Sequence, residues 1–166
     1  MKSKKGVIIT VVILIAITIA SFTVWQIPDN PKMTIVVTDF ESHLDGIDAR
    51  HNIIKNAVDE SLLKLVNNEI TPSEFISIAE ISSSQINSQI IELVESDAPE
   101  EWQESYLNYL EYLRSSNSYI RETLALANLQ IEEYSDSDEA ENILKKIEIL
   151  QEESIEYAKR SIDSRP

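Results

Sequence analysis

The residues best suited to chemistry are two histidines, His43 and His51, in a chain without cysteine. Asp48 and His51 are three positions apart, so on a helix they would share one face and form a candidate pair of metal ligands. A carboxylate-bridged di-iron bundle needs a Glu-x-x-His from each of two helices and further glutamates, and no histidine lies outside this segment. We therefore expect His51 to be a structural residue with a hydrogen-bond partner inside the bundle or at its edge. Metal binding by His51 and Asp48 is the alternative.

A second candidate is the acidic cluster at residues 132–141, which includes Asp136 and Asp138. Carboxylate oxygens suit Ca²⁺, but the cluster lacks the glycine and the terminal glutamate spacing of an EF-hand loop. Acidic residues are also favoured at the start of a helix, where they interact with the helix dipole. We interpret the cluster as a helix start, and the sequence predicts no cofactor.

Four segments begin with a residue that can cap a helix, followed three positions later by glutamate. In such a capping box the first side chain accepts from a free backbone N–H, and the glutamate reaches back to the N–H of the capping residue. A proline in the first turn costs no hydrogen bond there. The four starts are Thr38 with Glu41, Thr71 with Glu74, Asp97 with Glu100, and Asp136 with Glu139.

Apolar residues recur at steps of three and four after each start, which predicts amphipathic helices of about 30, 24, 36 and 26 residues. The short connections between them favour antiparallel neighbours. The sequence therefore predicts an all-α fold in which residues 39–166 form an antiparallel up-down four-helix bundle. The alternative is a three-helix arrangement with the second segment broken at Ser82–Ser84, and residues 115–118 could interrupt the third.

Ahead of this domain, residues 6–27 form an apolar run without a charge, long enough to cross a membrane as a helix. Lys2, Lys4 and Lys5 precede it, so the positive-inside rule places residues 1–5 in the cytoplasm and the rest outside. Residues 28–38 are expected to be a linker with an extended arm. The alternative is a signal peptide cleaved before Ser21, which would release a secreted domain.

The net charge of the chain is −15, and all 29 acidic residues follow the apolar run. This excess repels nucleic acid. Between Lys64 and Arg114 there are ten acidic residues and no Lys or Arg, a pattern that could receive a basic partner. We name Glu100, Glu101 and Glu104 as candidates for partner binding. Tyr112 falls outside the apolar stripe of its segment and is a further candidate.

The first third of the chain resembles small uncharacterised membrane-anchored extracytoplasmic helical proteins of ammonia-oxidising archaea. The resemblance rests on residues 1–9 (MKSKKGVII), residues 25–28 (WQIP) and residues 37–46 (VTDFESHLDG). It implies an archaeal cell membrane with the domain in the pseudo-periplasm, and it implies no activity.

Three functions remain for this sequence. The first is a non-enzymatic interaction or structural module, anchored in the lipid bilayer through residues 6–27 and binding a protein partner or a second copy. The second is a ligand-sensing bundle that acts through a partner subunit, since the five residues before the anchor are too few to signal. The third is a metal-binding bundle or carboxylate enzyme.

Overall fold

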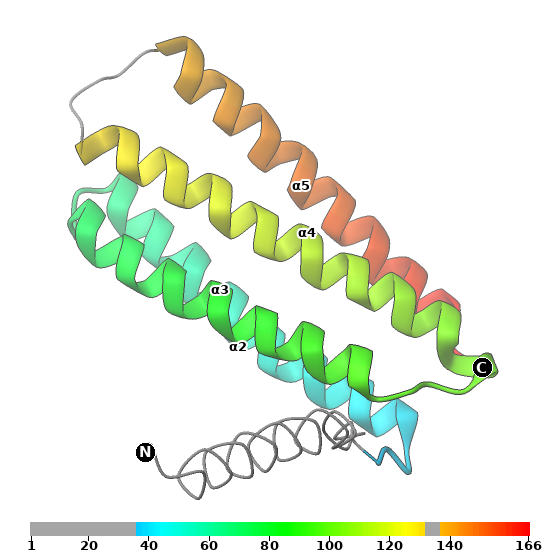
Figure 1. The fold of residues 1–166 in the computed structure, drawn as a ribbon. Coiled ribbons are helices and arrows are strands. Elements are labelled where there is room, and N and C mark those ends of the chain that lie inside the picture. Colours follow the sequence, from blue (N-terminus) through cyan, green and yellow to red (C-terminus); the bar gives the residue numbers. More distant parts are fainter. Residues whose placement is uncertain (1–35, 132–136) are drawn as a thin grey trace, which may run out of the picture. The chain divides into compact units, whose positions relative to one another are not determined.

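The computed structural model describes residues 36–131 and 137–166, and this part of the chain is helical without any strand (Figure 1). The helices are α2 (Phe40–Val66), α3 (Pro72–Glu95), α4 (Glu100–Ile131) and α5 (Ser137–Asp163). Their lengths of 27, 24, 32 and 27 residues are close to those predicted. The three-helix alternative is wrong, because α3 continues through Ser82–Ser84 and α4 continues through residues 115–118.

Two of the predicted helix starts need correction, and one is confirmed. Thr71 and Glu74 form the complete capping box at the start of α3. The cap of α2 is Asp39 rather than Thr38, since the Asp39 carboxylate accepts from the backbone N–H of Ser42 at 3.0 Å. Asp97 does not directly precede α4; it has a left-handed φ of 49° and belongs to the turn before it. The predicted cap Asp136 lies outside the described residues.

Consecutive helices lie side by side and run in opposite directions, so the four pack together around one core (Figure 1). Helix α4 contacts all three of the others. The core includes fully buried Leu44 and Ile47 of α2, Phe75 and Ile86 of α3, and Leu113 of α4. These residues recur at helical spacing, so the apolar stripes of the sequence are what the helices bury.

Helix α5 packs closely on α4 because small hydroxyl residues line the contact. The Ser105 hydroxyl donates to the backbone carbonyl of Ser161 at 2.7 Å, and the Ser115 hydroxyl donates to the carbonyl of Leu150 at 2.9 Å. A side chain as short as serine can reach the backbone of a neighbouring helix only when the two helices approach closely. These hydrogen bonds also satisfy hydroxyls that are buried in the interface.

The predicted membrane span at residues 6–27 lies outside the described residues. Among residues 36–131 and 137–166, no helix is both long and apolar enough to cross a membrane. Of the expected extended arm, only residues 36–38 are described; they adopt no regular structure, and Val36 is exposed.

The helix caps lead to a stability prediction. Replacing Thr71 with alanine removes one half of the capping box, so Thr71→Ala should lower the free energy of unfolding by about 1 kcal/mol. Urea denaturation followed by circular dichroism measures this loss. Thr38→Ala is the matched control and should leave stability unchanged, because Asp39 caps α2. An equal loss in both variants would contradict the assignment of the caps.

Candidate functional site

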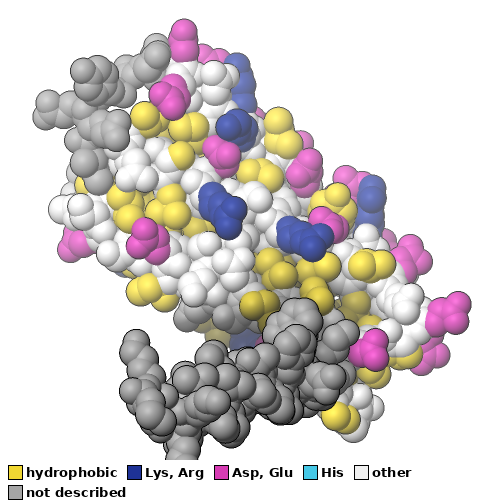
Figure 2. Space-filling view, in the orientation of Figure 1, with side chains coloured by type: hydrophobic (Ala, Val, Ile, Leu, Met, Phe, Trp, Pro, Cys, Tyr) yellow, Lys and Arg dark blue, Asp and Glu magenta, His cyan; other side chains and the backbone are white. Residues whose placement is uncertain are grey.

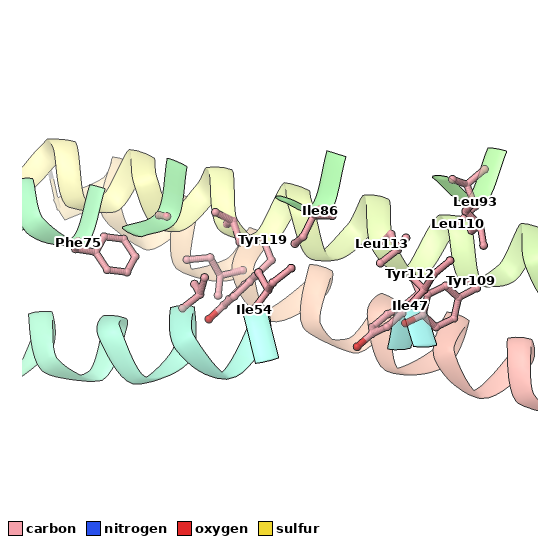
Figure 3. Packing of buried hydrophobic residues seen from close by; sticks show 14 of the residues in the cluster. Ile47, Ile54, Phe75, Ile86, Leu93, Tyr109, Leu110, Tyr112, Leu113 and Tyr119 are labelled. Carbon is pink, nitrogen blue, oxygen red and sulfur yellow. The ribbon is translucent and has the colours of Figure 1, made fainter. Parts of the chain in front are cut away.

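Tyrosines from α4 cross the core to reach polar groups of α2. The Tyr106 hydroxyl donates to the carbonyl of Phe40 at 3.0 Å. The hydroxyls of Tyr109 and Tyr119 donate to the carboxylates of Asp48 at 3.0 Å and Asp59 at 2.9 Å. Figure 3 shows Tyr109, Tyr112 and Tyr119 extending from α4 into the buried cluster that contains Ile47 and Ile54 of α2. Hydrogen bonds to a charged acceptor are stronger than neutral ones, so these contacts join α2 firmly to α4.

His51 lies at the centre of this region with 0% of its surface exposed. Its ring meets the Tyr112 ring edge to face, with centroids 4.7 Å apart. Neither ring nitrogen makes a hydrogen bond within the described structure, and the side-chain oxygen of the neighbouring Gln89 accepts none. The expectation that His51 is buried is confirmed. Within this part of the chain no regular hydrogen bond to the ring is formed, and Gln89 is a polar side chain close enough to act on the imidazole.

Burial lowers the pKa of His51 from 6.5 to about 4, because the charged imidazolium would lose its hydration. The negative charge of Asp48 and the closeness of Gln89 oppose this shift, while Lys55 adds to it. Desolvation is the largest effect, so His51 is neutral at physiological pH. A neutral imidazole keeps one N–H donor and one acceptor, and both are unused here.

A small cavity of about 20 Å³ lies beside His51. Its lining combines side chains from all four helices, including Lys55, Ile86, Ser116, Tyr119 and Gln151. A space of this size holds one water molecule, and a water here would meet several polar groups. It is too small for an organic substrate.

The metal hypothesis required His51 and Asp48 to act together. Asp48 instead accepts hydrogen bonds from Tyr109 and from the side-chain amide of Asn52. Among the described residues, no group of three histidine, aspartate or glutamate side chains could hold a metal ion. Asp138 is exposed at the start of α5, and Asp136 lies outside the described residues. The second histidine, His43, has its Nδ1 2.9 Å from the Tyr106 hydroxyl and its Nε2 3.3 Å from the Glu92 carboxylate.

A groove between the end of α3 and the start of α4, which we call the acidic groove, has a volume of about 310 Å³. Its floor contains Leu93, Ala98, Tyr106 and Leu110. Val94 and Leu107 form its apolar sides, and their side chains are 60% and 61% exposed. The remaining lining residues are Asp97 and Gln103.

Two of the predicted partner-binding residues, Glu100 and Glu104, do not line this groove but share a stripe of α4 with Leu107, which does. Glu100, Glu104, Leu107 and Glu111 are spaced by four, three and four positions, which places an exposed leucine on the same stripe of α4 as three acids. Glu101 points elsewhere, because it shares the face of Ser105, which packs on α5. Figure 2 shows one face of the molecule, on which exposed apolar side chains lie among acidic and basic ones.

The prediction for Tyr112 was wrong. Tyr112 is only 7% exposed and packs against His51 and Tyr109. The apolar stripe predicted for α4 covers only part of the surface that the helix buries. Three helices contact α4, and serines rather than apolar residues line its contact with α5. Burial raises the pKa of Tyr112 to about 12. This tyrosine is therefore part of the core and is not on the surface of the bundle.

Comparison with protein-family models, with curated proteins and with solved structures finds no match to this chain.

The burial of His51 predicts a pH-dependent stability. Its pKa in the folded chain, about 4, lies below the value of 6.5 in the unfolded chain. The unfolded chain therefore binds more protons in this window, and stability falls as the pH falls from 6.5 towards 4. Between about pH 7 and about pH 5 the loss from His51 should be about 2 kcal/mol. Urea denaturation at the two pH values measures it.

The matched control is His51→Phe, which keeps an aromatic ring in the core and cannot be protonated. The pH dependence of stability between these two values should be smaller in this variant than in the natural chain by the same amount. An identical pH dependence in both proteins would show that His51 is charged in the folded chain or is protonated without cost.

Proposed function

We propose that this chain is a membrane-tethered, extracytoplasmic helical module that acts by binding another protein and has no catalytic activity of its own. The observation that carries the proposal is the acidic groove: an apolar floor, the exposed apolar side chains of Val94 and Leu107, and the acidic residue Asp97 in its lining. An apolar groove on a helical bundle is a common binding site for an amphipathic helix.

The charge of the surface around the groove indicates a basic partner. Neither Lys nor Arg occurs between residues 65 and 113, the stretch that forms all of α3 and the first half of α4. Lysine or arginine side chains of a partner would therefore meet carboxylates such as Glu100 and Glu104 without a competing positive charge on α3. The proposed ligand is a basic amphipathic helix that places its apolar face on Leu107 and Val94.

The tether is a proposal from the sequence. Residues 6–27 are uncharged and apolar, and three lysines precede them, which supports a membrane anchor with the helical domain outside. The resemblance to archaeal membrane-anchored proteins supports the same arrangement.

Binding can be tested with a synthetic 18-residue peptide of leucine and lysine, patterned as an amphipathic helix. The full chain is placed in nanodiscs of neutral lipid, and fluorescence anisotropy measures the binding, with empty nanodiscs as the blank. We expect saturable binding that weakens with salt. Leu107→Gln should weaken it by about tenfold, since it removes one large apolar contact.

Two charge variants separate a specific groove from general attraction to an acidic protein. Glu104→Gln removes a carboxylate on the α4 stripe that includes Leu107, and Glu152→Gln removes an exposed one on α5. We expect only the first to weaken binding beyond the small effect of net charge. Equal effects of the two variants, or no effect of Leu107→Gln, would refute the acidic groove as the binding site.

The tether can be tested on the native protein. Fractionation should recover the intact chain with membranes after washing in high salt, because an apolar span is not held by charge. N-terminal sequencing should find the apolar run still present. A mature protein that begins at Ser21 and stays in the soluble fraction would overturn the anchor and leave a secreted domain.

A further inference from the structure

The outer face of the α2 and α3 hairpin carries small and apolar residues that the fold itself does not bury. On α2, Gly46, Ala49, Ile53 and Ala57 are all exposed. Their spacing of three, four and four positions places them along one stripe of the helix. Ile53 is 70% exposed, so most of its apolar surface faces the solvent.

Gly46 is the clearest sign that this stripe has a partner. A glycine inside a helix is less stable than alanine, because it loses more backbone freedom on folding. Gly46 has no positive φ, and a Cβ at this position would meet no atom within 4 Å. Nothing within residues 36–131 and 137–166 requires a glycine here. A second helix packed closely against α2 from outside would require one.

Charge is balanced on this face, whereas the rest of the chain is strongly acidic. Residues 81–91 of α3 contain no charged side chain. Arg50 is paired with Glu92 at 2.7 Å, and Lys64 is paired with Glu60 at 2.6 Å. Two copies with a net charge of −15 repel each other over most of their surfaces. At this face they can approach without that repulsion.

A groove of about 420 Å³ runs between α2 and α3 on the same face. Ile53, Ala57, Ser82, Gln85 and Gln89 are among the residues that line it. Small residues leave room in the groove, and exposed Ile53 projects at its edge. One surface therefore offers both a projecting side chain and a groove that could receive one. Gln89 is only 5% exposed and forms the buried floor of this groove.

We propose that a second copy of this chain binds here, and that the two α2 and α3 hairpins form a symmetric dimer. In a two-fold interface each copy offers the same surface, so Ile53 of each packs into the groove of the other. The charge-balanced stripes then lie together at the centre, and the acidic surfaces stay in water. The acidic groove between α3 and α4 is a separate surface and remains free in the dimer.

Sedimentation of the full chain in a neutral detergent tests the dimer. We expect a concentration-dependent equilibrium between monomer and dimer. Ala57→Glu adds a charge and bulk on the α2 stripe and should raise the dissociation constant by about tenfold or more. Leu107→Glu adds the same charge at the acidic groove and should leave the dimer unchanged while weakening the leucine and lysine peptide. The two variants thus separate failure of the dimer from failure of the proposed function.

Crosslinking tests the location, because the chain has no cysteine of its own. Ile53→Cys and Ile155→Cys place single thiols at positions that are both 70% exposed, on α2 and on α5. With a short bismaleimide, we expect Ile53→Cys to form a covalent dimer and Ile155→Cys to stay monomeric. A monomer at every concentration, a dimer that Ala57→Glu does not weaken, or equal crosslinking of both thiols would overturn the proposal.

Discussion

Helix α4 has to contact three other helices at once. The packing of the rest of the bundle depends on which side chains α4 presents to each of them. Towards α5 it presents serines, which let the two backbones approach until hydroxyls reach carbonyls. Towards α2 it presents tyrosines, whose length spans a wider gap and ends at Asp48 and Asp59. Side-chain length on α4 therefore sets the distance to each neighbour.

The wider spacing on the tyrosine side explains the environment of His51. The Tyr112 ring from α4 packs against the imidazole, and the small cavity beside it is a space that side chains of four helices do not fill. Its lining is mostly apolar but includes polar side chains such as Ser116 and Gln151. Burial also keeps His51 neutral, so the imidazole adds no uncompensated charge to the core at neutral pH.

The sequence predicts the coarse fold well, because helical periodicity and the Thr71 capping box are local signals. It predicts burial on α4 less well. A single apolar stripe identifies Tyr106, Tyr109 and Leu113, but it misses Tyr112 and the buried serines, whose burial depends on a third neighbouring helix. The cap at Asp39 was missed because two adjacent residues can both cap a helix, and only the backbone shows which does. The two grooves form where neighbouring helices pack against each other, so the sequence of a single helix does not predict them.

The tyrosine contacts also have a mechanical consequence. The acceptors on α2 are the Phe40 carbonyl, Asp48 and Asp59, and the donors follow in the same order along α4. A shift of α4 along α2 by one helical turn, about 5.4 Å, would break all three hydrogen bonds together and leave buried hydroxyls unpaired. The three hydrogen bonds therefore oppose a piston-like sliding of α4 along α2.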